Sequence, residues 1–191
     1  MSVTLVNNCV LIPNPPHWGS PLKWRRQWSS AVAPGVTGAE DRSSLRTKPL
    51  LRIEFTLLAA TPSERALLEA RLLAALRLGR AAVPFWARPT PVEPPGADIN
   101  SLGMTTSGLW PWAAGDWVYF PPSPGVAEEF RQLTAASPGI MAWTDQLTAS
   151  HREGTFAYPL LFGTPSVGDI NAISNHLAEA PSLALQEPLG N

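Results

Sequence analysis

Residues 50–87 constrain the fold of this chain most, because they predict a strand, a helix and a second strand in immediate succession. In "LLRIEFTLLA" (50–59) apolar and polar residues alternate, which is typical of an antiparallel strand with one buried face. The short apolar run "AAVPFWA" (81–87) predicts the second strand. The residues expected on the buried face of the first strand are Leu51, Ile53, Phe55 and Leu57.

The segment between these strands carries the signals of a helix at both ends. Thr61 is placed as the N-cap, Pro62 occupies the first helical position, and Glu64 is placed to close a capping box. Ala, Leu, Glu and Arg, which favour helices, fill the segment up to Gly79, a typical C-terminal stop. We predict a helix over 62–78, with an apolar stripe that includes Leu68, Leu72, Ala75 and Leu76.

Short strand-like runs separated by Pro, Gly and Ser turns fill much of the remaining chain. In "KWRRQWSS" (23–30), Trp24, Arg26 and Trp28 are expected on one face of a strand, with Arg25 and Gln27 on the other. The stretch "APGVTGAEDRSS" (33–44) is expected to be a loop. Four further strands are predicted within 115–120, 128–136, 139–147 and 154–163.

These patterns predict an α+β, mainly β fold: an N-terminal antiparallel sheet with one packed helix, followed by a small β-barrel or sandwich-like region. We expect a strand-rich domain over 1–90, a Pro/Gly-rich arm or linker over 91–114, the small β-barrel-like region over 115–165, and an extended C-terminal tail over 166–191. Trp110 and Trp112 in the arm are suited to docking on a neighbour. A loop that folds these tryptophans back onto its own domain is the alternative.

The charge is low and unevenly distributed. Only 15% of residues are charged, against about 25% in ordinary soluble domains. Residues 1–90 carry 12 Lys and Arg against 5 Asp and Glu, whereas residues 91–191 carry 2 against 10. Such asymmetry fits a nucleic-acid face or a head-to-tail contact between copies. Because the basic residues are scattered and only two are Lys, the head-to-tail contact is favoured, and we expect no nucleic-acid partner.

Few residues suggest chemistry. The single cysteine, Cys9, excludes an intrachain disulfide and is best interpreted as a small buried hydrophobe. No phosphate-binding loop, zinc motif or nucleophile elbow is present. We therefore expect no catalytic residue, no cofactor and no metal. No run of about 20 apolar residues predicts a membrane span, and no secretory signal is visible at the N-terminus.

Three polar groups were considered as catalytic candidates. His151 and Glu153 lie two residues apart, as in a dyad, but Gly154 and a strand pattern follow directly, so a hairpin loop is the preferred interpretation. Glu128–Glu129 is interpreted as a solvated strand start because adjacent strand residues point to opposite faces. Asp116 follows a glycine before a strand, which is typical of a turn.

The segments "GDWVYF", "EEFRQLTAASPGIMAW" and "QLTASHREGTFAYPLLFG" resemble a small β domain in tail proteins of tailed bacteriophages. There a G-D-x-V strand, a Glu-rich strand start and an H-x-x-G-T-x-x-Y-P strand follow one another. "DRSSLRTKPLLRIEFTLL", the capped helix and "VPFWA" are similar to the opening of such tail-tip proteins. The similarities cover about residues 20–165, and the chain lacks the large repeat or receptor-binding region of many tail fibres.

The resemblance implies a virion structural protein of the tail tip or baseplate, without enzymatic activity. It would form a homo-oligomeric ring, a trimer or hexamer, that links the tail tube to hub, tip or fibre components. Assembly would take place in the cytoplasm of the bacterial host. The residues expected to make contacts are Trp110 and Trp112 in the arm, and Arg42, Arg46 and Arg52 before the helix.

Two functions of other classes stay open. A carbohydrate-binding module would use exposed tryptophans to stack on host surface polysaccharide. A cell-wall hydrolase would require His151, Glu153 or Asp116 for its activity.

Overall fold

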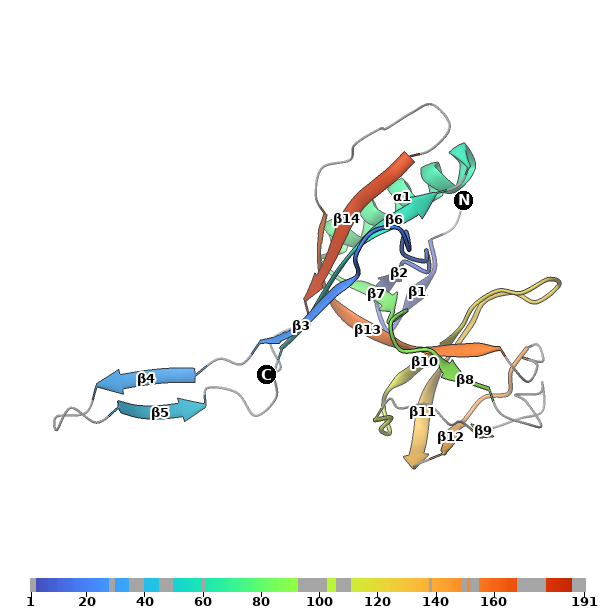
Figure 1. Ribbon diagram of the computed structural model, residues 1–191. Coiled ribbons are helices and arrows are strands. Elements are labelled where there is room, and N and C mark those ends of the chain that lie inside the picture. The colour runs from blue at the N-terminus through green and yellow to red at the C-terminus, as the bar shows by residue number, and fades with distance from the viewer. Residues whose placement is uncertain are drawn as a thin grey trace. The chain divides into compact units, whose positions relative to one another are not determined.

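The computed structural model describes most of the chain and divides it into two compact units. Unit 1 comprises Met1–Pro15 and Ala82–Leu161, and unit 2 comprises Pro16–Ala81 and Phe162–Asn191. Figure 1 shows the elements of both units along the chain. The described residues are 3–27, 30–34, 40–44, 50–59, 61–92, 103–105, 111–137, 139–148, 151, 155–167 and 178–186.

Unit 1 is built from short antiparallel strands. β13 pairs with β10 and β8, β10 with β11, β11 with β12, and β12 with β9, while β1, β2 and β7 extend the same set of pairings. The first half of β13 belongs to unit 1 and the second half to unit 2. The strands are β1 (Leu5–Val6), β2 (Cys9–Leu11), β7 (Ala81–Pro84), β8 (Thr90–Pro91), β9 (Gly103–Thr105), β10 (Trp117–Phe120), β11 (Glu129–Ser137), β12 (Ile140–Trp143) and β13 (Phe156–Val167).

The core of unit 1 is a cluster of apolar side chains from four of these strands and their connections. Cys9 is buried and forms no disulfide, as expected for a small hydrophobe. Phe120 and Trp143 meet edge to face, with ring centroids 5.9 Å apart. The core residues are Val92, Val118, Phe120, Leu133, Met141, Trp143, Leu147 and Ala157, with Trp112 and Ala136 packed against them.

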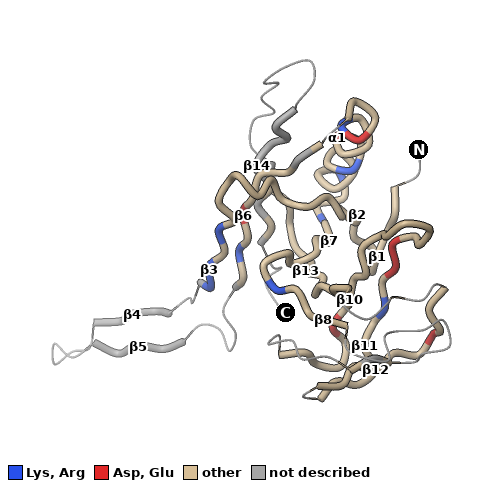
Figure 2. Tube along the Cα trace, turned by 45° about the vertical axis from the view of Figure 1, so that its right-hand side comes forward, with Lys and Arg blue, Asp and Glu red and all other residues tan. Residues whose placement is uncertain are grey.

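Unit 2 combines a sheet with one helix. Its strands are β3 (Lys23–Gln27), β6 (Leu50–Ala59), β14 (Ala178–Gln186) and the second half of β13, joined in the order β3–β6–β14–β13. Helix α1 (Pro62–Leu78) contacts β6 and lies beside it in Figures 1 and 2. Between β3 and β6 in the sequence, β4 (Ser30–Pro34) and β5 (Glu40–Ser44) pair with each other.

The helix begins and ends as the sequence predicts. Thr61 Oγ1 accepts a hydrogen bond from the Glu64 backbone N–H, and Glu64 Oε2 accepts one from the Thr61 backbone N–H, which completes the capping box. Gly79 adopts a left-handed conformation with φ of 67° and ends the helix. Leu68, Leu72 and Ala75 are buried, but Leu76 is 44% exposed because it lies about 80° around the helix from Leu68.

The alternation along β6 also has the predicted consequence. Ile53, Phe55 and Leu57 are buried, while Arg52, Glu54 and Thr56 on the other face are only half-buried. The buried row of β6 is continued by Leu183 and Leu185, which lie directly opposite Phe55 and Ile53 on β14. The apolar face of the sheet therefore forms the core of unit 2 together with α1.

The predicted fold class, α+β and mainly β with one helix, is confirmed for the described residues. Three details of the sequence interpretation are corrected. Within 33–44, which we expected to be a loop, β4 and β5 pair as a hairpin. The segment 166–191 is not only a tail, because residues 178–186 form β14 and add a strand beside β6. The units are also interleaved in sequence, unlike the consecutive domains that we expected.

Candidate functional site

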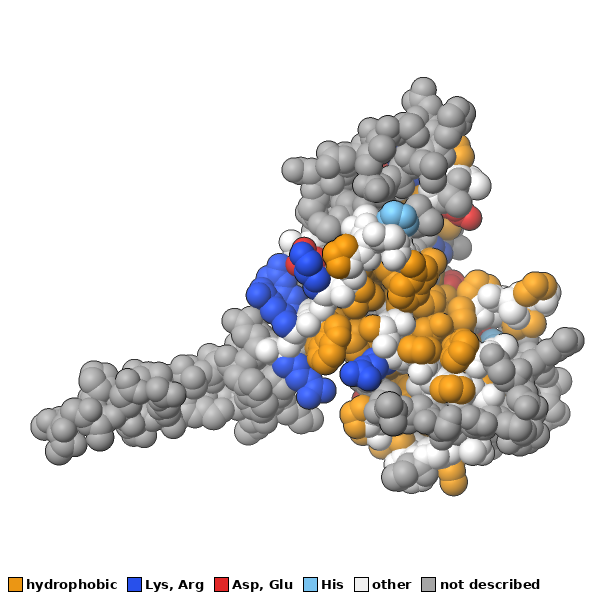
Figure 3. Space-filling view, in the orientation of Figure 1, with side chains coloured by type: hydrophobic (Ala, Val, Ile, Leu, Met, Phe, Trp, Pro, Cys, Tyr) orange, Lys and Arg blue, Asp and Glu red, His pale blue; other side chains and the backbone are white. Residues whose placement is uncertain are grey.

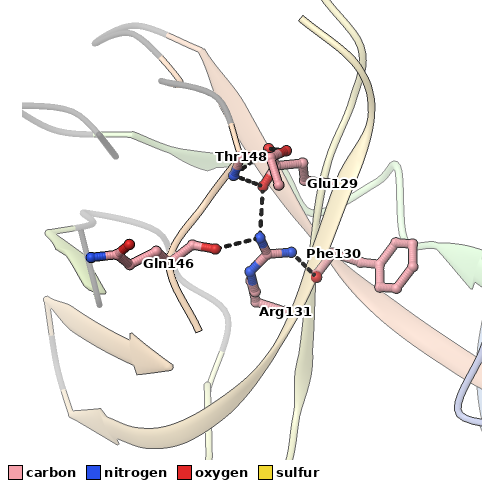
Figure 4. A network of polar contacts seen from close by, with 5 residues as sticks. All are labelled: Glu129, Phe130, Arg131, Gln146 and Thr148. Atoms are coloured by element: carbon pink, nitrogen blue, oxygen red, sulfur yellow. Dashed lines mark hydrogen bonds and ion pairs between the residues drawn. The ribbon is translucent and has the colours of Figure 1, made fainter. Parts of the chain in front are cut away.

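A cluster of polar side chains lies at the start of β11, and it is the densest polar arrangement in the described part of unit 1. Its members are Glu129 and Arg131 on β11 and Thr148 in the turn after β12 (Figure 4). Glu129 and Arg131 are two residues apart on one strand, so their side chains extend from the same face. The sequence therefore places an acidic and a basic group side by side before any tertiary contact forms.

The carboxylate of Glu129 is fully engaged. Glu129 is 5% exposed, and its Oε2 lies 3.1 Å from Arg131 Nη2. The Thr148 backbone N–H donates to Oε1 over 2.9 Å, and the Thr148 hydroxyl donates to the same oxygen. Arg131 in turn donates to the carbonyl oxygens of Gln146, at 2.7 Å, and Phe130, at 2.8 Å. These contacts anchor the turn that contains Gln146 and Thr148 onto β11.

His151 lies next to this cluster. It is 5% exposed, its ring stacks on Phe120 with centroids 4.4 Å apart, and its Nε2 is buried without a hydrogen-bond partner in the described structure. Burial lowers the pKa of His151 below its ordinary value; the Glu129 carboxylate opposes this shift and the Arg131 guanidinium adds to it. The His151 ring is therefore buried as a flat aromatic surface against Phe120.

This arrangement is suited to fixing structure. An acid–base pair needs a reacting proton within reach, but the oxygens of Glu129 are directed at Thr148 and Arg131 inside the unit. No group of three or more His, Cys, Asp or Glu side chains in the described ranges is placed to hold a metal ion. The charge-assisted hydrogen bonds of the cluster instead fix the turn that contains Gln146 and Thr148.

A second charged feature lies on the sheet of unit 2. Lys23 and Arg25 project from one face of β3, and Arg52 projects from the same face of β6 directly opposite Arg25. Lys23 and Arg25 are exposed and Arg52 is half-buried. Figures 2 and 3 show Lys and Arg residues gathered over β3 and the adjoining part of β6. We call Lys23, Arg25 and Arg52 the basic face.

The predicted contact residues fall into different places. Arg52 belongs to the basic face, and Arg42 lies in β5 opposite Val32. Trp112 is half-buried and packs against the core of unit 1, as in the interpretation of a loop folded onto its own domain. Arg46 and Trp110 lie outside the described residues. Arg42 and Arg52, both in unit 2, lie on β5 and β6, which do not pair with each other among the described strands.

The structure also places most of the polar residues that the sequence offered as catalytic candidates. Asp116 Oδ2 accepts a hydrogen bond from the Ala113 backbone N–H over 2.9 Å, which is the predicted turn. Glu128 accepts a hydrogen bond from the Tyr119 hydroxyl at 3.0 Å. The interpretation of Glu129 as solvated was wrong, since its side chain faces inward. Glu153 lies outside the described residues.

Sequence reasoning missed the pairing of Glu129 with Arg131 and the basic face. The signal for the first is the E-x-R spacing at a strand start, which puts opposite charges on one face. The signal for the second is the alternation in "KWRRQ", which puts Lys23 and Arg25 on the same side, but the strand opposite could not be known.

Comparison with known proteins adds no relative. No protein-family model matches this chain, and no curated protein matches it. In the part of the chain that the structure describes, no helix is long and apolar enough to cross a membrane.

Proposed function

We propose that this chain is a structural subunit of the tail tip or baseplate of a tailed bacteriophage, which forms a ring and links the tail tube to the distal tip or fibre components. The segment that resembles phage tail proteins contains the polar cluster and most of the core of unit 1. The positions of Asp116, His151 and Tyr158, which belong to the resembling motifs, therefore bear on the proposal.

The observation that carries the proposal is that these residues have architectural positions. Asp116 fixes the turn before β10, and His151 stacks on Phe120. Tyr158 packs against Trp86 with ring centroids 4.6 Å apart. The characteristic residues of this segment thus form turns and pack aromatic rings. Such positions support a structural role, because a subunit of an assembly must present a fixed surface to its neighbours.

The distribution of charge also supports the proposal. By sequence, unit 2 carries eleven Lys and Arg against eight Asp and Glu, a net charge of +3, and unit 1 carries three against seven, a net charge of −4. Copies in a ring meet through two different patches, one on each neighbour. Opposite charge on two parts of one chain favours such a contact and disfavours a contact between like parts.

Labelling of virus particles tests the function directly. An antibody against the chain, applied to purified particles whose genome encodes it, is expected to bind at the distal end of the tail in electron micrographs. Particles lacking the gene should show tails that end abnormally. Label confined to the capsid, or normal tails without the chain, would contradict the proposal. A second antibody against the major capsid protein serves as the positional control.

The structure also favours one alternative, a carbohydrate-binding module. Trp18 is 68% exposed and Trp24 is 42% exposed, and both belong to unit 2. Exposed indole rings are suited to stacking on sugar rings. Binding of the purified chain to a glycan array, abolished by Trp18→Ala and retained by Leu5→Ala, would support this function, whereas equal loss with both variants would not.

A further inference from the structure

The basic face of unit 2 contains two like charges at directly opposite positions of paired strands. Arg25 on β3 lies directly opposite Arg52 on β6. Like charges at directly opposite positions of an antiparallel pair destabilise the sheet. Neither guanidinium makes an ion pair with another described residue, and Lys23, one pleat along, adds a third positive charge. Glu54 lies opposite Lys23 and is the carboxylate nearest along these two strands.

The position of the pair places it at an accessible edge. In the described structure β3 pairs with β6 alone, so its other edge carries backbone groups that no described strand occupies. Arg25 and Arg26 are both exposed and point to opposite faces of this strand. An incoming acidic surface could therefore meet positive charge whether it approached the edge or the polar face.

We propose that the basic face docks on the acidic unit 1 of a second copy of this chain. The choice of partner rests on charge complementarity, since unit 1 carries a net charge of −4 and the Glu129–Arg131 pair inside it cancels to zero. The net negative charge of unit 1 therefore comes from residues other than Glu129 and Arg131. Among the described acidic residues of unit 1, Asp145 is the exposed one, in the turn after β12.

This contact would specify how copies meet in the proposed ring. It rests on the proposed function, which supplies the expectation that copies meet head to tail. Two different patches, the basic face and the surface around Asp145, would repeat the same contact from one copy to the next. The attraction would be screened by salt, because at least Lys23, Arg25 and Asp145 are exposed. Self-association should accordingly weaken between about 50 mM and about 500 mM NaCl.

Arg25→Glu separates association from folding. The substitution places a glutamate directly opposite Arg52, which replaces a repulsive pair by an attractive one, so the variant should unfold at the same temperature as the wild type or higher. Its self-association, measured by sedimentation velocity on the purified full chain, should weaken by about tenfold or more. Arg80→Glu is the matched control, because Arg80 is exposed in the same unit and the change in net charge is identical.

A mixing experiment tests the partner surface. Asp145→Asn should also associate less than the wild type when alone, but it retains the basic face, whereas Arg25→Glu retains the acidic surface around Asp145. An equimolar mixture is therefore expected to form heterodimers and to stop there, because the remaining patches are both altered. A wild-type chain that stays monomeric at all concentrations, Arg25→Glu that associates like Arg80→Glu, or a mixture that stays monomeric would each overturn the proposal. Tight binding of duplex DNA that Arg25→Glu abolishes, without self-association, would assign the face to nucleic acid and overturn it as well.

The two proposals can fail separately. If the purified chain associates through these surfaces but is absent from tails, the proposed function fails and the contact remains. If labelled tails contain the chain and Arg25→Glu still assembles normally, the contact fails and the proposed function remains.

Discussion

The imidazole of His151 is stacked on the ring of Phe120, with centroids 4.4 Å apart and an interplanar angle of 24°. The pair joins the polar cluster around Glu129 to the apolar core of unit 1, because Phe120 also meets Trp143 edge to face. Protonation of this ring would place a positive charge in a buried position, which costs free energy. The stability of unit 1 should therefore respond to protonation of a single side chain.

The pH dependence of unfolding follows from His151. Its pKa is lowered in the folded chain, so the unfolded chain binds more protons at this residue. Its contribution to the free energy of unfolding should be complete above the ordinary pKa of 6.5 and should be lost as the pH falls below it. Urea unfolding between about pH 7.5 and about pH 5 measures the effect. In His151→Phe, which keeps an aromatic ring and removes the titration, the decline over this range should be smaller.

The control for this experiment is His17→Gln. His17 is half-buried in unit 2 and its Nδ1 lies 3.1 Å from Ser20 Oγ. Comparison with His17→Gln shows whether the pH dependence belongs to His151 in particular. If His151→Phe declines as much as the wild type, His151 does not limit stability at low pH.

Loss of the buried carboxylate should destabilise unit 1. Glu129→Gln keeps the shape of the side chain but leaves the Arg131 guanidinium, whose side chain is 17% exposed, without its counter-charge. We expect the free energy of unfolding to fall by about 2 to 3 kcal/mol, as for a broken buried ion pair that is partly accessible to water. Glu128→Gln is the matched control. The Glu128 carboxylate accepts one hydrogen bond, from the Tyr119 hydroxyl, so this substitution should lower the free energy of unfolding by less than about 1 kcal/mol.

The double variant Glu129→Gln with Arg131→Met distinguishes the ion pair from simple packing. Removing both charges should recover part of the lost stability, because no uncompensated charge then stays buried. Additive losses in urea unfolding would show that the two side chains do not depend on each other.

The close contact between β9 and β12 should tolerate no side chain at Gly103. A Cβ atom at this position would overlap the backbone carbonyl oxygen of Met141, which cannot move aside as a flexible side chain could. Gly103→Ala should lower the free energy of unfolding by about 1 to 3 kcal/mol or separate the two strands. Thr105→Ala, an exposed change in the same strand, should cost less than about 0.5 kcal/mol in the same measurement.

The two tryptophans before β10 should behave differently when replaced singly. Trp112 packs against the core of unit 1, so Trp112→Ala should lower the melting temperature and cost about 2 kcal/mol or more. Trp110→Ala tests the predicted docking of the arm: a folded subunit that fails to enter tails is expected, and normal tails would contradict it. Separate variants are needed because the double replacement would mix both effects.

Local signals predicted local structure well. The helix over 62–78 starts and ends where the sequence places it, because its caps are formed by Thr61, Glu64 and Gly79, all within reach of the helix ends. The strand over 50–59 was likewise predicted from alternation alone. Each of these features depends on neighbours in the sequence.

A local signal that the sequence interpretation overlooked lies at Asn7 and Asn8. Both residues have positive φ, 49° and 58°, and they connect β1 to β2 as a two-residue hairpin loop. Asparagine tolerates this conformation better than most residues, and such loops match the twist of paired strands. "NN" between two apolar runs therefore predicts a hairpin.

What the sequence could not provide were the long-range pairings. Glu129 is buried because Thr148, nineteen residues later, folds over it, and no pattern near Glu129 encodes that contact. Arg25 and Arg52 share a face only because β3 pairs with β6 in one particular register. The polar cluster around Glu129 and the basic face thus depend on tertiary structure, whereas the strands on which their residues lie can be predicted from local sequence.

The place of β14 in unit 2 has a consequence for the order of folding during synthesis. β14 lies between β6 and β13, so the sheet of unit 2 lacks an interior strand until residues 178–186 have left the ribosome. Until then, the apolar row of Ile53, Phe55 and Leu57 has no strand on that side to complete the core. A nascent chain can form helix α1 early, but the sheet of unit 2 is complete only once residues 178–186 have joined β6. A chain truncated before residue 178 would leave β6 with an open edge toward other chains, and we expect it to aggregate more readily.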